Sequence, residues 1–242
     1  NKNIITTGPA GSGKTIVAKT LAHEFIKSKK RVLFLCYNRT LSNKIRYEFE
    51  KNEPLIDVAT FHSFSRKIID SFDLDWWKKN SVLDDFWELN VPVKLEACIP
   101  LYKERYDAII IDEAQDFKEL WFELIFILAK DSATKHIFMD QMQDIFRRYT
   151  KIPNAERFIK YNLPENCRNT KAIVKYLSNV LNKKIESFDN SPSGGDVVVK
   201  SFKNSLEQQK YLIDEIKSLV REQGIKSEQI LILINTSKLN SC

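Results

Sequence analysis

The stretch that decides the fold lies near the start of the chain and reads Gly8-Pro9-Ala10-Gly11-Ser12-Gly13-Lys14-Thr15. It matches the phosphate-binding consensus G-x-x-x-x-G-K-[ST] without a departure. The run Ile4–Thr7 before it predicts a short buried strand and Thr15–Lys27 predicts a helix, so strand, loop and helix come in the order that the consensus requires. Glycines let such a loop turn tightly, so that its N–H groups and the positive end of the helix point at an anion. The stretch therefore predicts a site for a nucleoside triphosphate.

The side chains of this loop have distinct expected roles. Lys14 is expected to reach the β- and γ-phosphates, and the Thr15 hydroxyl is expected to ligate Mg²⁺. The expected nucleotide contacts are Gly8, Pro9, Ala10, Gly11, Ser12, Gly13, Lys14, Thr15 and the next residue, Ile16. The loop alone does not indicate what the hydrolysis of ATP would drive.

Composition limits the class of protein. With 242 residues, 43% hydrophobic and 29% charged, the chain is typical of a globular protein with a real core. It has no apolar run long enough to cross a bilayer and no secretory signal, so we expect a cytoplasmic protein. The four cysteines (Cys36, Cys98, Cys167 and Cys242) are scattered, which argues against a disulfide framework or a zinc site. A net charge of +6 permits a nucleic-acid partner but does not require one, because 32 acidic residues are interleaved.

Strand-like and helix-like segments alternate along the chain. Apolar runs of strand length occur at Arg31–Cys36, Ile56–Thr60, Tyr106–Ile111, His136–Met139 and, more weakly, Phe158–Tyr161. Helical spacing occurs at Thr40–Phe49, Phe61–Ile69, Phe117–Ala129 and Thr170–Leu181. This alternation predicts an α/β fold with a parallel sheet flanked by helices, interrupted by a small helical insertion at about residues 70–105. We expect the insertion's tryptophans to pack in a small core.

The second part of the chain predicts another α/β unit. A linker signal at Ser191–Gly195 is followed by the strand-like Val197–Val199, the helix Ser205–Arg221 and the strand-like Ile230–Ile234. We expect residues 1–165 to form the first domain, and residues 166–242 to begin a second one. Because the chain starts without Met and stops just after a strand-like run, we expect a fragment of a longer protein.

Two carboxylates follow an apolar strand in the middle of the chain. Ile109-Ile110-Ile111 leads directly into Asp112 and Glu113, at the strand end where ligands bind in open α/β sheets. Asp112 suits a Mg²⁺ ligand, because this cation prefers oxygen ligands. Glu113 suits the base that orients and deprotonates the attacking water. Together with the loop, the pair predicts hydrolysis of a nucleoside triphosphate.

Five elements in order resemble the motifs of superfamily 1 helicases of the UvrD and Rep kind. The sequence Asp112-Glu113-Ala114-Gln115-Asp116 resembles their motif II, and Tyr37-Asn38 resembles motif Ia. Thr60-Phe61-His62-Ser63 is similar to an element that contacts single-stranded DNA. Asp140-Gln141-Met142-Gln143-Asp144-Ile145-Phe146 is similar to motif III, and Asn166-Cys167-Arg168-Asn169-Thr170 to the NYRST element of motif IV. The resemblance implies a RecA-like fold and an ATP-dependent motor that moves along or unwinds DNA.

The resemblance also implies roles for single residues. Gln143 would sense the γ-phosphate, Arg168 would place a guanidinium on it, and Gln115 would link the nucleotide and DNA sites. The implied DNA contacts are Asn38, Thr60, Phe61, His62 and Phe146. The implied cofactors are ATP and Mg²⁺, and the implied partners are single-stranded DNA or a duplex junction and a fused or associated nuclease domain.

Two positions depart from the family pattern. Cys167 stands where the family has a Tyr that stacks on adenine, and Ile16 stands where an Arg usually follows the loop. Their loss predicts weak discrimination between nucleotide bases. Two other functions stay open, a phosphoryl-transfer kinase and a non-catalytic scaffold gated by ATP. Release of phosphate to water distinguishes the motor from the kinase.

Overall fold

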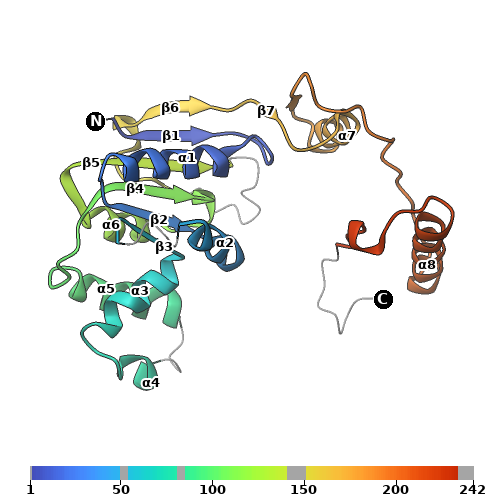
Figure 1. Ribbon diagram of the computed structural model, residues 1–242. Coiled ribbons are helices and arrows are strands. Elements are labelled where there is room, and N and C mark those ends of the chain that lie inside the picture. Colours follow the sequence, from blue (N-terminus) through green and yellow to red (C-terminus); the bar gives the residue numbers. More distant parts are fainter. Residues whose placement is uncertain (1, 50–53, 81–84, 141–150, 234–242) are drawn as a thin grey trace. The chain divides into compact units, whose positions relative to one another are not determined.

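The computed structural model describes residues 2–49, 54–80, 85–140 and 151–233, which form two compact units, 1–195 and 196–242 (Figure 1). The strands of the first unit are β1 (Ile4–Thr7), β2 (Val32–Cys36), β3 (Ile56–Ala59), β4 (Tyr106–Asp112), β5 (Ala129–Met139), β6 (Ile159–Asn162), β7 (Glu165–Asn166) and β8 (Glu186–Ser187). Its helices are α1 (Lys14–Lys27), α2 (Arg39–Phe49), α3 (Phe61–Asp70), α4 (Trp76–Asn80), α5 (Val91–Cys98), α6 (Glu119–Phe126) and α7 (Lys171–Leu181).

Six of these strands form one parallel sheet in the order β3-β2-β4-β5-β1-β6. β7 and β8 pair separately, also in parallel. All strands of the large sheet run in the same direction, so their carboxyl ends lie side by side at one end of the sheet. The segments that follow β1, β2, β3 and β4 therefore start from this same end. The predicted parallel α/β sheet is confirmed, and its architecture is that expected of a RecA-like fold.

Both faces of the sheet are covered by helices, which explains why its strands read as continuous apolar runs. On β4, Ala108 and Ile110 join the core formed with α1 and α2, whereas Ile109 and Ile111 join the core formed with α3, α5 and α6. All four side chains are fully buried. Successive side chains of the strand point to opposite faces of the sheet, so β4 contributes to the core on each face.

The helix predicted over Phe117–Ala129 is shorter in the structure. A 3₁₀ turn spans Ala114–Asp116, α6 covers Glu119–Phe126, and β5 already begins at Ala129 instead of His136. Ala129 pairs with Tyr106 of β4, after which the register between the two strands shifts. Strand pairing thus overrides the local helical pattern at Ala129, because the ladder satisfies its backbone groups.

The described residues between α3 and β4 form short helices joined by turns, in line with the helical insertion that the sequence predicts. α4, a π-helical turn at Phe86–Asn90 and α5 lie here, and α5 packs against α3 and α6 (Figure 1). The ring of Trp77 is buried and contacts Phe86, so this tryptophan packs in a core as expected. That core is continuous with the one under the sheet and is not a separate small one. Trp87 differs, because it is 43% exposed.

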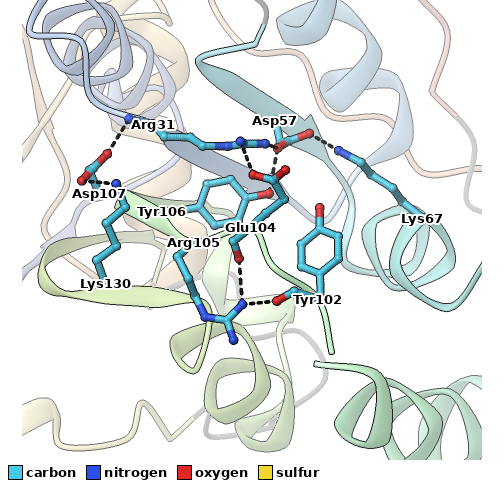
Figure 2. A network of polar contacts seen from close by, with 9 residues as sticks. All are labelled: Arg31, Asp57, Lys67, Tyr102, Glu104, Arg105, Tyr106, Asp107 and Lys130. Atoms are coloured by element: carbon cyan, nitrogen blue, oxygen red, sulfur yellow. Dashed lines mark hydrogen bonds and ion pairs between the residues drawn. The ribbon is translucent and has the colours of Figure 1, made fainter. Parts of the chain in front are cut away.

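Polar contacts tie the amino ends of three neighbouring strands together (Figure 2). Asp57 of β3 accepts hydrogen bonds from the Tyr106 hydroxyl at 2.7 Å and from Arg31, just before β2, at 3.3 Å. Lys67 of α3 pairs with the same carboxylate. Burial alone would raise the pKa of Asp57, but the hydrogen bonds from Lys67 and Tyr106 outweigh burial and hold this pKa below its ordinary value. The network lies at the amino ends of the strands, whereas Asp112 lies at the carboxyl end of β4. Its hydrogen bonds and ion pairs stabilise the fold.

The second unit is described over residues 196–233. It contains α8 (Ser205–Arg221) and a 3₁₀ turn at Ser227–Gln229. The strands predicted at Val197–Val199 and from Ile230 onward are absent from this part of the chain, where neither run has a strand to pair with. Residues 166–195 belong to the first compact unit. The domain boundary expected after residue 165 stays a prediction. None of the helices described in either unit is long and apolar enough to cross a membrane.

Candidate nucleotide and nucleic-acid sites

The Gly8–Thr15 loop connects β1 to α1 and presents an uncapped helix end. Gly11 and Gly13 have φ of 83° and 89°, a left-handed conformation that glycine adopts without strain. α1 begins at Lys14 with no side-chain cap, so the N–H groups of its first turn have no side-chain acceptor among the described residues. The Ser12 hydroxyl is buried and likewise has no partner in the described part of the chain. Both features suit an anion at this end of the helix.

The Lys14 side chain folds back onto the loop. Its Nζ donates to the carbonyl oxygens of Gly8 at 2.8 Å and Pro9 at 3.0 Å, and lies 3.9 Å from Oδ2 of Asp140 at the end of β5. Only 6% of Lys14 is exposed. The ammonium group is therefore held inside the turn of the loop, next to the amino end of α1.

Thr15 and Asp112 meet although they are far apart in sequence. The Thr15 hydroxyl donates to Oδ2 of Asp112 at 2.6 Å, and the Glu113 N–H donates to Oδ1 of Asp112 at 3.0 Å. Asp112 is fully buried at the end of β4, and burial raises the pKa of its carboxyl to about 6. A hydroxyl and a carboxylate oxygen are suitable Mg²⁺ ligands, so the two residues fit the metal predicted for them.

Glu113 is held in place by its neighbour Gln115. Glu113 has a φ of 53°, a conformation that costs energy for a residue with a side chain. Nε2 of the buried Gln115 donates to Oε2 of Glu113 at 2.7 Å, and Oε1 of Gln115 accepts from the Asp140 N–H at 2.9 Å. Gln115 thus connects the proposed base to the end of β5. Gln143 and Phe146, which follow β5, lie outside the described residues.

Arg168 lies beside the crest of the loop, which Ala10 and Gly11 form. A Cβ atom added to Gly11 would meet Cβ of Arg168 at 2.9 Å, and the Cys167 N–H donates to the Gly11 carbonyl at 2.9 Å. Cys167 is exposed, and so is Ile16, at 67%. The segment that contains Arg168 therefore contacts the Gly8–Thr15 loop. The two residues that depart from the family pattern, Ile16 and Cys167, face solvent.

A pocket opens at the carboxyl ends of β2 and β3. Its volume is about 650 Å³, and it is lined by Tyr37, Arg39, Ser42, Asn43, Arg46, Thr60, His62, Ser63, Arg66, Trp87, Glu88, Lys118 and Trp121. Four of these side chains are cationic and one is a carboxylate, Glu88, which pairs with Lys118. Positive charge beside aromatic rings is the composition that suits single-stranded nucleic acid.

The predicted DNA contacts fall into three groups. Thr60 and His62 line this pocket, although the Thr60 hydroxyl also caps α3 by accepting from the Ser63 N–H at 3.2 Å. Asn38 does not line it and caps α2, its side-chain oxygen accepting from the N–H groups of Thr40 and Leu41. The ring of Phe61 is 1% exposed and stacks on Trp121, with centroids 4.2 Å apart, so it belongs to the core and is not available to a base. Apolar contacts on α3 place Phe61 inward, as its helical spacing allows.

His62 packs between two tryptophans. Its ring makes edge contacts with Trp87 at 4.8 Å and Trp121 at 5.0 Å. Burial, and to a smaller extent the charge of Lys118, holds the pKa of His62 below its ordinary value, which favours a neutral ring. Trp87 and the arginines of this pocket could not be assigned from the sequence, since no local pattern reveals that the insertion lies beside α2 and α3.

Residues 1–153 match the family described as Schlafen group 3, DNA/RNA helicase domain. The chain belongs to this family. The match covers more than half of the chain and includes the Gly8–Thr15 loop, Asp112 and the pocket beside Trp87. No curated protein matches the chain. The helicase-like nature expected from the motifs is therefore supported for this Schlafen-type domain, while its finer likeness to UvrD and Rep rests on the motifs alone.

Proposed function

We propose that this Schlafen-type helicase domain binds Mg²⁺-ATP on the Gly8–Thr15 loop and couples its hydrolysis to movement along single-stranded DNA, in the manner of UvrD. The observation that carries the proposal is the hydrogen bond of 2.6 Å between Thr15 and Asp112. It joins the loop to Asp112 at the end of β4 and thereby supports a single site that uses the amino end of α1 and this carboxylate. Thr15 and Asp112 would hold Mg²⁺, which would neutralise charge on the phosphates when bound.

The chain's own residues supply the remaining chemistry. Lys14 binds the β- and γ-phosphates, Glu113 accepts a proton from the attacking water, and Arg168 stabilises charge on the γ-phosphate. Gln115 keeps the Glu113 carboxylate in position through its hydrogen bond. Gln143 is proposed to report the state of the γ-phosphate to the DNA site. A strand bound in the pocket beside Trp87 would contact Thr60 and His62, which follow directly after β3.

The metal site is tested by Asp112→Asn. In the unmodified chain, chelation of Mg²⁺ is expected to weaken ATP binding about tenfold, because the triphosphate loses its bridge to Thr15 and Asp112. In Asp112→Asn the amide preserves the shape of the side chain but removes its charge, so ATP affinity should be equally low with and without Mg²⁺. Titration calorimetry at both conditions measures the difference. A variant that keeps the full Mg²⁺ dependence would show that Asp112 is not the ligand.

The nucleic-acid site is tested by Trp87→Ala. Loss of one stacking platform is expected to weaken single-stranded DNA binding by about 1–3 kcal/mol, or roughly 5- to 100-fold. The dependence of affinity on salt should stay unchanged, because no phosphate contact is removed. Fluorescence anisotropy with a labelled oligonucleotide measures both quantities, with an RNA of the same sequence in parallel.

Tyr47→Ala is the matched control for this experiment. Tyr47 is 75% exposed on α2 and does not line the pocket. Its removal also deletes an exposed aromatic ring, yet it should leave DNA affinity unchanged. Equal losses in the two variants would argue that DNA binds elsewhere on the domain.

A further inference from the structure

Asn166 occupies the junction between the Gly8–Thr15 loop and the segment that contains Arg168. Its Nδ2 donates to the Ala10 carbonyl at 2.7 Å, while its Oδ1 accepts from the N–H groups of Arg168 at 3.0 Å and Asn169 at 2.8 Å. Its backbone carbonyl accepts from the N–H of Phe188 at 3.1 Å. Asn166 is 2% exposed, so these hydrogen bonds are shielded from water.

The bond to Ala10 orients a peptide group at the crest of the loop. The carbonyl and the N–H of a trans peptide point in opposite directions, so fixing the Ala10 carbonyl on Asn166 directs the Gly11 N–H away from it. The Cys167 N–H holds the Gly11 carbonyl in the same way, at 2.9 Å. Two successive peptide groups of the loop are therefore oriented by residues 166 and 167. The N–H of the second group, that of Ser12, donates to the Pro9 carbonyl at 3.1 Å, so the tie through Asn166 matters for the Gly11 N–H. Oriented N–H groups of this kind are what a phosphate-binding loop uses.

Close packing leaves little freedom in this arrangement. A Cβ atom on Gly11 would lie 2.9 Å from Nδ2 and 3.0 Å from Oδ1 of Asn166, so the loop crest touches both ends of the amide. One amide group donates to the loop and accepts from the backbone of Arg168. A shift of the loop would therefore move the turn that holds the arginine.

We propose that Asn166 is a positioning residue that ties the crest of the Gly8–Thr15 loop to Arg168 and thereby sets the preference of the site for ATP over ADP. The inference rests on the proposed function, in which Arg168 contacts the γ-phosphate. ADP lacks that phosphate and gains nothing from a well-placed arginine. The Asn166 amide is engaged with the Ala10 carbonyl and with the N–H groups of Arg168 and Asn169, so its effect on the nucleotide is expected to pass through Arg168.

Asn166→Asp separates this role from a merely structural one. Aspartate keeps the oxygen that accepts from Arg168 and Asn169, so the turn is retained. The donor to Ala10 is replaced by a carboxylate oxygen that repels the carbonyl, so only the tie to the loop is broken. Asn162→Asp is the matched control, because Asn162 lies near Gly8 and Pro9 and its side-chain oxygen accepts a hydrogen bond from the Thr7 hydroxyl at 3.0 Å. Within the described residues its side chain donates no hydrogen bond that the substitution would remove.

Calorimetric titration of the 242-residue chain with Mg²⁺-ATP and Mg²⁺-ADP tests the proposal. Asn166→Asp is expected to lower ATP affinity about tenfold more than ADP affinity, whereas Asn162→Asp keeps the ratio of the unmodified chain. In an Arg168→Ala background, Asn166→Asp should cause no further change in the ratio. An unchanged ratio in Asn166→Asp, or full additivity with Arg168→Ala, would overturn the inference.

The reactivity of the Cys167 thiol measures, without any nucleotide, whether the bond from Asn166 to the loop restrains this segment. In a Cys242→Ser background Cys167 is the exposed thiol, since Cys36 and Cys98 are buried. We expect a thiol reagent to modify it faster in Asn166→Asp than in Asn162→Asp, because the segment is released from the loop. Equal rates would show that the contact does not restrain the segment. If the unmodified chain bound neither nucleotide, the proposed function would fail, whereas an unchanged ATP-to-ADP ratio in a binding-competent variant defeats only the role of Asn166.

Discussion

Lys14→Met is expected to weaken the binding of Mg²⁺-ATP by about 100-fold while the fold is retained. In the free loop the ammonium group is bonded to two neutral carbonyl oxygens, those of Gly8 and Pro9. A bound triphosphate would replace them with charged oxygens, and such charge-assisted bonds are about twice as strong. Methionine keeps the length and apolar stem of lysine but makes none of these bonds. Loss of two of them, at about 1.5 kcal/mol each, corresponds to roughly 100-fold in affinity.

Lys19→Met provides the matched control. Lys19 lies on the same helix, but its Nζ pairs with Glu48 at 2.7 Å on the outside of the domain. This variant removes the same charge from α1 and should bind ATP as the unmodified chain does. Titration calorimetry, with thermal melts to compare the folded states, decides the outcome. If Lys14→Met bound ATP within a few-fold of the unmodified chain, the Gly8–Thr15 loop would not be the nucleotide site.

Asp57→Asn, at the amino ends of the strands, is expected to have the second large effect, a loss of stability. Figure 2 shows the contacts of Asp57. The carboxylate serves three donors from different elements, Arg31, Lys67 and Tyr106. Its side chain is 18% exposed, and Tyr106 is fully buried. An amide cannot satisfy two cations and a buried hydroxyl, so the free energy of unfolding should fall by about 2–4 kcal/mol. Urea denaturation followed by circular dichroism measures the loss.

The direction in which this loss of stability changes with pH tests whether the charge of Asp57 causes it. Because the pKa of Asp57 is lower in the folded than in the unfolded protein, its contribution is present above the unfolded value of about 3.9 and is lost as the pH falls through the folded value. The difference between the chain and Asp57→Asn should therefore be constant near neutral pH and shrink below about pH 4. Asp75→Asn, which breaks an exposed pair with Lys78, should leave the denaturation midpoint unchanged. A difference that grows on acidification would contradict the assignment.

Much of the fold is predictable because its signals are local. The loop consensus places a turn between a strand and a helix, and the apolar run Ile109–Ile111 requires a strand buried on both faces. The limits of such patterns appear at Ala129, where pairing with Tyr106 extends β5 into a predicted helix. They appear again at Val197–Val199, which has the composition of a strand but no partner strand within the described residues of its unit.

The residue types of the candidate site follow from the sequence alone: a loop that ends in Lys14 and Thr15, and two carboxylates, Asp112 and Glu113, at the end of an apolar strand. Only the tertiary structure decides that Thr15 lies 2.6 Å from Asp112, and that Asn166 joins the loop to Arg168. The physical reason is that dihedral preferences and side-chain periodicity act over a few residues. Contacts between distant segments depend instead on the order of strands in the sheet and on the packing of both its faces.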